Sequence, residues 1–447
     1  MVSKKTIHKV IYRLLLFGVI LLFALAVTIE PIDTTPLNEK EFYRQTQSLL
    51  KERKISAFAP KSALKAGWHE VNITPAKAAM AGYTPRSSFT SVADSLYCRV
   101  VSVSNGATLV SFISFDLLIV PPKVKAAILR KIKEEQINTF PYFGAVHSHN
   151  SIGNWDNSLA GSIIAGKYDP ALVKMLANSA IQAINNSIHD LQPASLAVVQ
   201  ATAPDLIYNR LDTNAATDTL LRGITVNRAD GSTGYLVTFA AHATNLPMKS
   251  TFLSADYPGC VVKELNERGD FAMFMAGMVG SHSLKNIDGL KHFEAIKATG
   301  KQISHKIFNA NKTKIDTVAT IYHEQIPLPY RQAQLKLEKD WQLRNWLFEL
   351  GFGPLDLSIT VVKIGSLVMI AAPGDFSGEL YLNHIANNHP DLNIIITSFN
   401  GDFAGYIIDD QHYFSSKKEE ANVMNWLGPY GGQYFAEIIN QLINKFN

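Results

Sequence analysis

The stretch CRVVSVSNGATLVSFI, residues 98–113, carries the pattern that decides the fold class of this chain. It contains two short runs rich in β-branched residues, Cys98–Val103 and Thr108–Ile113, which are typical of buried strands. A helical pattern follows at Lys123–Gln136, and the same alternation continues outward along the chain. We predict further strands at Ser195–Gln200, Gly234–Phe239, Ser358–Val362, Leu367–Ile370 and Asn393–Thr397, and further helices at Pro170–His189, Phe293–Asn309 and Phe376–Asn388.

Strands that alternate with helices predict an α/β fold with a large mixed sheet flanked by helices. No internal repeat, low-complexity tract or Pro- or Ser-rich linker interrupts the alternation after residue 65. We therefore predict one catalytic domain over residues 66–447. Because this length exceeds the usual domain range, two closely packed lobes are the alternative.

The composition excludes several classes of protein. Apolar residues make up 47% and charged residues 18%, which is typical of a packed globule and excludes disordered, collagen-like and coiled-coil chains. The net charge of +4 is too weak to indicate a nucleic-acid partner. Two cysteines, Cys98 and Cys260, cannot form a disulfide framework; one bridge is conceivable, and buried free thiols are favoured.

An apolar run, Leu14–Val27, follows a cluster of basic residues at the start of the chain. Its 14 residues lie within the signal-peptide range of roughly 7–15 and fall short of the roughly 20 of a bilayer-spanning helix. Ala24–Ala26 offers a cleavage site, whereas Val10–Tyr12 lengthen the apolar segment ahead of Arg13. We predict that residues 1–30 are a signal peptide or signal anchor, and that the protein is exported to the periplasm or the cell exterior.

The segment between this leader and the domain is polar. Residues 31–65 contain Pro31 and Pro36, and Glu39–Lys54 shows a charged helical pattern. We predict a stalk with one amphipathic helix.

His147 and His149 lie in a polar, glycine-bounded segment, GAVHSHNSIG, at the end of a strand-like approach. Residues two apart in a regular strand share a face, but their ring nitrogens seldom converge on a single ion. Both histidines would reach one metal ion only if the chain turns there; otherwise one binds metal and the other serves nearby. Alone, the His-x-His pattern is a weak signal.

Further candidates follow other predicted strands. His242 comes after the strand that ends at Phe239, and a satisfied core histidine is the simpler interpretation. Asp256 could orient that histidine or cap the next helix. Asp375, in AAPGDFS, could be a helix N-cap. Tyr406 taken alone would be a packed aromatic residue, and Arg210 a surface charge. Together, two histidines, a carboxylate and a tyrosine make a plausible zinc site.

Other motifs lie in order along the chain, at Ala66–Pro75 (AGWHEVNITP), Met80–Tyr83 (MAGY), Asp94–Arg99 (DSLYCR) and Ser114–Asp116 (SFD). The segment with His147 and His149 is similar to the motif Thr-His-Thr-His-Ser-Gly-Pro-Gly. In kind and order these motifs resemble the catalytic N-terminal domain of the neutral/alkaline (non-lysosomal) ceramidases. The resemblance spans roughly residues 65–447.

The resemblance implies a role for each candidate. His147, His242, Asp375 and Tyr406 correspond to the zinc ligands of the family. His149 would be a residue that contacts substrate or handles a proton. The substrate-site arginine and serine of the family correspond to Arg210 and Ser283.

The chain also departs from the family pattern. Asp375 replaces a glutamate, so the ligand is one methylene shorter. Ser151-Ile152 stands where the family has Gly-Pro, and Ser281 where it has an aspartate. Asp409-Asp410 resembles the family's acidic pair, but Lys418-Glu419 stands in place of its Tyr-Glu. By this comparison, we expect the chain to lack the family's C-terminal immunoglobulin-like domain.

By resemblance, we expect a Zn²⁺-dependent amidase that cleaves ceramide or a related N-acyl lipid at a membrane surface. Another amide or ester hydrolase on the same scaffold is the first alternative, and an inactive membrane-tethered binding protein is the second. An amidohydrolase barrel opening with His147 and His149 is less favoured, because such barrels place this pair on their first strand.

Overall fold

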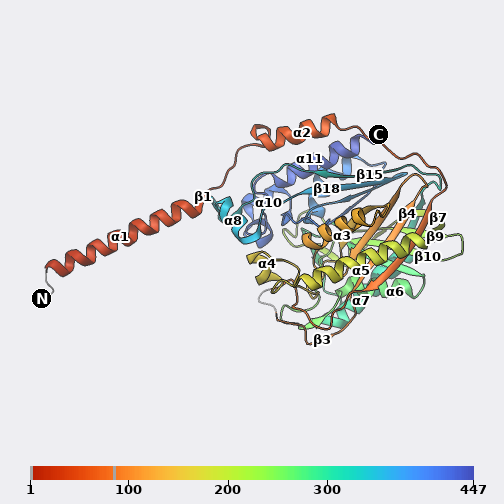
Figure 1. Cartoon of the computed structure of the whole chain (residues 1–447), viewed down its shortest axis with the longest axis horizontal. Helices are drawn as coiled ribbons and strands as arrows, with labels where there is room; N and C mark the ends of the chain where they lie inside the picture. Colours follow the sequence, from red (N-terminus) through yellow and green to blue (C-terminus); the bar gives the residue numbers. More distant parts are fainter. Residues whose placement is uncertain (1–3, 84–86, 447) are drawn as a thin grey trace.

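The computed structural model describes residues 4–83 and 87–446. It contains a long N-terminal helix that projects from an α/β body, as Figure 1 shows. The helices are α1 (Lys4–Thr28), α2 (Glu41–Glu52), α3 (Pro122–Glu134), α4 (Leu159–Ile164), α5 (Pro170–His189), α6 (Asp256–Asn266), α7 (His292–Phe308), α8 (Asn345–Phe352), α9 (Gly378–His384), α10 (Asp410–Ser415) and α11 (Gly431–Asn444), with single 3₁₀ turns at Leu37–Glu39, Ala386–Asn388 and Glu419–Ala421.

A large mixed sheet forms the centre of the body, as predicted. Its pairs are mostly antiparallel, whereas β5–β6 and β10–β12 are parallel, so the sheet is not the parallel barrel of the amidohydrolase alternative. In spatial order its strands are β12 (Phe271–Ala276), β10 (Thr233–Phe239), β9 (Leu220–Arg228), β7 (Gln192–Thr202), β2 (Lys65–Asn72), β4 (Tyr97–Ser104), β5 (Leu109–Phe115) and β6 (Phe140–Ala145), and β14 (Asn311–Lys314) pairs with β7.

A smaller sheet packs against the inner face of the large one. Its strands are β15 (Ile321–Pro327), β18 (Ser358–Ile364), β19 (Leu367–Ala371) and β21 (Asn393–Thr397). Side chains alternate between the two faces of each strand, so Val101 of β4 packs with Val362 and Met369 in the core between the sheets, whereas Val100 packs outward with residues of α3 and α5. Helices α6 and α7 cover the β10 side of the large sheet, and α11 and α9 cover the small sheet.

Short strand pairs complete the fold at its edges. The pairs are β3 (Ser91–Val92) with β11 (Phe252–Leu253), β8 (Ile207–Asn209) with β13 (His282–Leu284), and β20 (Asp375–Phe376) with β22 (Tyr406–Ile407), and one three-stranded sheet contains β1 (Ile29–Pro31), β17 (Trp341–Leu343) and β16 (Leu335–Glu338).

Each predicted strand and helix of the domain is present, with boundaries shifted by a few residues. The largest difference is at Phe376–Asn388, where α9 begins at Gly378 and a 3₁₀ turn replaces the end of the helix. Ser377 caps α9 by accepting a hydrogen bond from the Leu380 backbone. Asp375 is therefore free of the capping role and belongs to a strand. Both cysteines are free thiols; Cys98 is buried and Cys260 is partly exposed.

The N-terminal helix is longer than the apolar run indicated. Among the described residues, one helix is long and apolar enough to cross a membrane, at Lys5–Thr28, and none of its apolar window is buried. The helix extends N-terminally from Leu14 through Val10–Tyr12 to Lys4. The expectation that the segment is too short to span a bilayer is therefore wrong. A signal sequence can be equally long and apolar, so the assignment of this helix as a signal peptide or an anchor stays a prediction.

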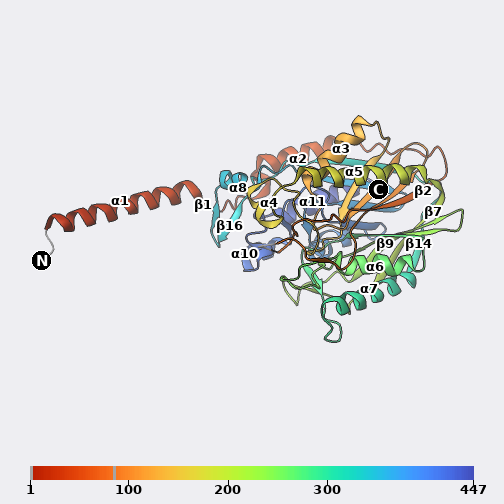
Figure 2. The ribbon, with the colours of Figure 1, turned by 60° about the horizontal axis from the view of Figure 1, so that its bottom comes forward.

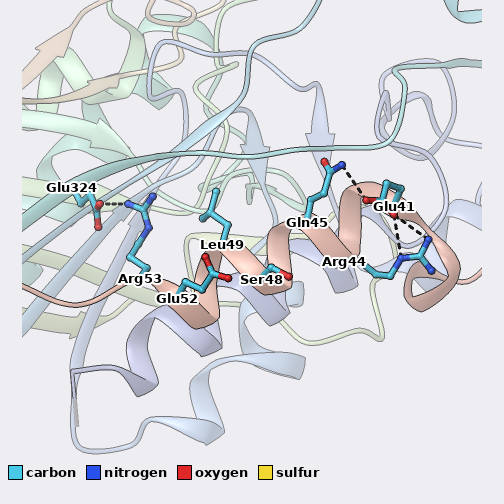
Figure 3. A pocket seen from close by; sticks show the side chains of 8 residues that line it. All are labelled: Glu41, Arg44, Gln45, Ser48, Leu49, Glu52, Arg53 and Glu324. Atoms are coloured by element: carbon cyan, nitrogen blue, oxygen red, sulfur yellow. Dashed lines mark hydrogen bonds and ion pairs between the residues drawn. The ribbon is translucent and has the colours of Figure 1, made fainter.

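The segment 31–65 lies against the domain. In α2, Leu50 is buried, and the Thr46 hydroxyl lies 2.8 Å from the Tyr434 hydroxyl of α11. The outer side of α2 borders an open groove, where Arg53 pairs with Glu324 of β15, as Figure 3 shows. Its eight lining residues include three glutamates and two arginines but no histidine or cysteine. The domain boundary at residue 66 stays a prediction.

Candidate metal centre

The loops that carry the candidate residues follow strands that end close together. His147 follows β6, His242 follows β10, Asp375 follows β19 and Tyr406 follows β21. Side chains at strand ends are held by a rigid sheet yet open to a cleft, which is where catalytic groups are commonly found.

A turn in the backbone brings His147 and His149 together. The chain leaves β6 at Ala145, and His147 takes a left-handed conformation with φ of 65°, which a residue other than glycine seldom adopts. Because the chain turns here, the Nε2 atoms of the two rings lie 3.3 Å apart. The chain therefore makes the turn that is needed for both histidines to reach one metal ion.

Backbone carbonyls fix the orientation of two imidazole rings. The Nδ1 of His147 lies 2.7 Å from the Leu118 carbonyl oxygen, and the Nδ1 of His242 lies 3.2 Å from that of His282. Each Nδ1 carries a proton to donate to its carbonyl, so each Nε2 presents a lone pair to the centre. This is the tautomer that a metal ion requires.

The carboxylate of Asp375 lies between these two rings. Its Oδ1 is 3.3 Å from the Nε2 of His147 and 3.3 Å from the Nε2 of His242. The β20–β22 pair places Tyr406 opposite Asp375, and the Tyr406 hydroxyl lies 3.2 Å from the Nε2 of His242. The structure therefore brings together all four residues for which the resemblance implied metal ligation.

The spacing of these atoms suits a metal ion. A tetrahedral zinc ion with ligand bonds of about 2.0–2.1 Å holds its ligand atoms about 3.3–3.4 Å apart, and the spacings above are 3.2–3.3 Å. In the described part of the chain, the buried Oδ1 of Asp375 has no well-formed hydrogen bond. An ion at the centre would satisfy it. The three histidines also form a group within 4.8 Å, so the geometry leaves His149 open as a ligand.

Burial favours the neutral form of two of the imidazoles. Burial, together with the nearby Arg210, lowers the pKa of His242 to about 3. Burial also lowers the pKa of His149 well below its ordinary value. Burial alone would raise the pKa of Asp375, but the adjacent His147 and His242 lower it below its usual range. Neutral imidazoles and an ionised carboxylate are the forms that ligate a metal.

Arg210 lies at the edge of the cluster. Its Nη2 is 3.1 Å from the Tyr406 hydroxyl and 3.1 Å from the Nε2 of His242. Its Nε is 3.2 Å from a carboxylate oxygen of Glu420. The ion pair orients the guanidinium toward the centre, where it could stabilise negative charge.

Two other candidates are placed differently. Ser283 lies on β13 opposite Tyr208 and lines a polar pocket of about 310 Å³ that includes Asn245; the contacts described for this chain do not join its side chain to the histidines. Its implied role stays a prediction. Among the described residues, no hydrogen bond or ion pair joins Asp256 to His242. Asp256 is the first residue of α6, and its carboxylate accepts a hydrogen bond from the Tyr257 backbone in the first turn of that helix. Its carboxylate accepts hydrogen bonds from the backbone of Asn245 and Leu246 and holds that turn.

Three residues at the site were not among the sequence candidates. Phe399 stacks on His147 with ring centroids 4.3 Å apart, and Tyr83 packs on His149 at 4.7 Å. Glu420 pairs with Arg210 and lies one position beyond the Lys418-Glu419 pair compared with the family. Tyr83 ends one of the quoted motifs, whereas no local pattern marks Phe399.

Comparisons with known proteins give a consistent result. A family profile described as neutral/alkaline non-lysosomal ceramidase, N-terminal, matches residues 65–283. Among curated proteins, none matches the chain significantly in sequence. The fold is similar to that in a crystal structure of neutral ceramidase from Pseudomonas aeruginosa, with a TM-score of 0.72 and 13% identity over 86% of this chain and 75% of that one. A structure of ceramidase complexed with C2 gives a TM-score of 0.71 and 13% identity, covering 86% of this chain and 76% of the other.

Proposed function

Because the chain belongs to the neutral/alkaline non-lysosomal ceramidase family, whose members are amide hydrolases, we propose that it cleaves the N-acyl amide of ceramide or a related N-acyl lipid, with Zn²⁺ as its metal. One observation supports this most strongly. The Oδ1 of Asp375 lies 3.3 Å from the Nε2 atoms of both His147 and His242, although the three residues come from separate parts of the chain. The Nδ1 atoms of both histidines already face backbone carbonyls, so neutral rings turn acceptor atoms toward the carboxylate, an arrangement that a bound cation would stabilise.

The ligand set consists of His147, His242, Asp375 and Tyr406. A zinc ion held there would lower the pKa of a bound water toward 7 and polarise the substrate carbonyl. The carbonyls of Leu118 and His282 keep both histidines in the tautomer that leaves Nε2 free for this purpose. Phe399, stacked on His147, limits the movement of that ring.

The remaining residues handle charge and protons. Arg210 contacts the hydroxyl of Tyr406, and both groups would stabilise the oxyanion that develops on the amide carbonyl. His149 lies 3.3 Å from His147 and would transfer a proton to the leaving amine. Glu420 keeps Arg210 charged and directed at the site.

A lipid substrate agrees with the location we propose, at the outer side of a membrane. The apolar helix α1 would lead to export and would either be cleaved or hold the protein at the bilayer. Ceramide is retained in membranes by its two chains, so an enzyme held at the surface meets its substrate there.

A substrate panel tests the proposal. Full-length protein in mild detergent would be given a short-chain ceramide, an N-acyl amino acid and a fatty-acid ester, each with and without a zinc chelator. The proposal requires sphingoid-base release that the chelator abolishes and added zinc restores. Faster cleavage of the N-acyl amino acid or the ester would replace ceramide by the first alternative substrate class. No hydrolysis of any substrate by zinc-loaded protein would favour the inactive binding protein.

A further inference from the structure

The end of the domain next to α1 has features that its proposed chemistry does not use. Helix α1 is joined firmly to the domain there. Its last carbonyls, at Ala26, Val27 and Thr28, accept hydrogen bonds from Arg344 and Trp346. A helix leaves its last carbonyls without partners inside the helix, so these two residues act as a C-terminal cap for α1.

The chain continues from α1 straight into a sheet of the domain. Strand β1 pairs with β17 directly after the helix, and Glu30 forms an ion pair with Arg344 at 3.1 Å. In both views α8 and β1 lie at the end of the domain where α1 leaves it, with α4 and α10 nearby (Figures 1 and 2). A bilayer that holds α1 would therefore face this end of the domain.

Large apolar side chains are exposed at this end. We call the surface formed by α4, β16, β17 and α8 the collar. The helices α4 and α8 of the collar pack against each other. Its exposed apolar residues are Leu159 and Ile163 of α4, Leu337 of β16, Trp341 of β17, and Trp346 and Leu350 of α8, with relative exposures between 44% and 64%.

Single exposed apolar residues are ordinary on a protein surface, but several on adjoining elements mark an interaction site. Tryptophan is the residue that most typically lies at the level of lipid headgroups. Two of the chain's five tryptophans, Trp341 and Trp346, lie on the collar within a few residues of the α1 cap. The collar thus has the composition of a membrane-interface surface.

A cavity opens in the same region. It has a volume of about 890 Å³ and is bordered by α3, α4 and α8. The exposed Leu159 and Leu350 belong to its lining, and Phe403 and Trp426 form part of its wall. Phe403 lies near Phe399, which stacks on His147. The apolar wall of this cavity therefore approaches the metal centre from the collar side.

The charges of α1 set its direction in the membrane. Its basic residues lie in the first half of the helix, at Lys4, Lys5, Lys9 and Arg13. Basic residues stay on the cytoplasmic side, so the domain and the collar would be on the opposite side, facing the bilayer surface that α1 leaves.

We propose that α1 is retained as an anchor and that the collar docks on the same bilayer, with Trp341, Trp346, Ile163 and Leu350 inserted at headgroup level. The proposal rests on the membrane location given under the proposed function and not on the reaction. Docking would hold the domain in one orientation over the lipid, with its apolar cavity toward the membrane. A second copy of the chain is the other possible occupant of the collar, and the test separates the two.

Tryptophan fluorescence offers a direct test because α1 contains no tryptophan. Full-length protein would be reconstituted into phosphatidylcholine vesicles in which part of the lipid carries bromine on the upper acyl chain. We expect brominated lipid to quench the protein's emission and the double variant Trp341→Phe/Trp346→Phe to lose most of that quenching. The variant Trp68→Phe is the control, since Trp68 stacks on Phe271 within the large sheet, and it should keep the quenching.

Several outcomes would overturn the proposal. These are equal emission in brominated and ordinary lipid, unchanged quenching in the collar double variant, or an N-terminus found after residue 26 in the membrane-bound protein. Crosslinking of two copies through Trp346→Cys, without quenching, would assign the collar to a dimer.

A second variant avoids the α1 cap. Ile163→Gln/Leu350→Gln changes two side chains that are 64% and 60% exposed, so the fold should tolerate it. We expect slower hydrolysis of long-chain ceramide in vesicles and unchanged hydrolysis of a short-chain ceramide in solution. Equal rates for variant and wild type on vesicles would contradict docking. If neither protein hydrolyses ceramide, the proposed function fails, and the quenching result still decides the docking.

Discussion

Asp375 and Tyr406 are partners across the two-residue parallel pair β20–β22, so backbone hydrogen bonds set the distance between a carboxylate and a phenol of the metal centre. The Asp375 backbone N–H donates to the Gly405 carbonyl at 3.0 Å. This close approach depends on Gly374, whose φ is 154° and where an added Cβ would lie 2.3 Å from the Gly405 oxygen. The pair places the Asp375 carboxylate beside His147 and His242, where it would ligate the proposed metal ion.

Replacing Gly374 by alanine should therefore damage the metal centre. The added methyl group would push β20 away from β22 and move Asp375 out of reach of the histidines. We expect a loss of bound zinc, measured by elemental analysis, while circular dichroism still shows a folded chain. Gly351→Ala is the matched control, since a Cβ there meets nothing within 4 Å. Full zinc content in Gly374→Ala would contradict the role given to this backbone pair.

Tyr406→Phe tests the contribution of the phenol. Its hydroxyl contacts both Arg210 and His242, so it is placed to act on the same developing charge as Arg210. Removing one oxyanion donor typically lowers kcat by about 100- to 1000-fold. We expect a loss of that size with a smaller change in KM. Tyr208→Phe, on β8, is the control, and an equal effect in both variants would argue for a merely structural role.

A buried ion pair supports the strand ends below the site. Arg99 of β4 contacts Asp116 at 2.7 Å, and both side chains are almost fully buried. Removing the sole partner of a buried charge typically costs about 3–5 kcal/mol; Arg99 would keep the half-exposed Glu70, 2.9 Å away, so we expect the lower end of this range. Asp116→Ala should lower the free energy of unfolding by that amount in urea titrations. Glu70→Gln, which removes the more exposed partner of the same arginine, should cost far less.

Stability should fall on acidification because of His323. This ring stacks between Phe58 and Phe140, and burial lowers its pKa from 6.5 to about 4. The folded state thus binds this proton less readily than the unfolded state, so the contribution of the neutral ring is complete above pH 6.5 and is lost as pH falls toward 4. We expect the decline of Tm between pH 6.5 and 4.5 to be shallower in His323→Gln than in wild type. Equal declines of Tm with pH in the variant and the wild type would exclude His323 as a cause of the acid destabilisation.

The predicted elements were found because strand and helix periodicities are local and strong. Val100 and Val101 alternate between two cores, and that alternation is visible in the sequence. The convergence of His147 and His149 could not be predicted, since it depends on a positive φ that no neighbouring residue dictates. Phe399 and Glu420 were missed because their roles arise only when distant segments meet.

The position of the N-terminal segment also lay beyond local patterns. The amphipathic pattern predicted α2, but nothing in it indicated that Thr46 would meet Tyr434 of the last helix. The 14-residue apolar run likewise did not predict the length of α1. This helix extends back to Lys4 through residues that are individually less apolar. Contacts between distant segments and the true ends of helices depend on tertiary structure.

Zinc content measures most directly whether His147, His242, Asp375 and Tyr406 hold a zinc ion. Elemental analysis would be run on full-length wild type, His242→Ala and Asp375→Asn, purified alike and dialysed against metal-free buffer. We expect one zinc per chain in wild type and, in both variants, an affinity lowered by more than about 100-fold. His323→Gln is the control and should keep its zinc, because His323 stacks on Phe58 and Phe140 and is not part of the metal centre. Full zinc content in both ligand variants, or none in wild type after incubation with zinc, would show that these residues do not hold the metal ion.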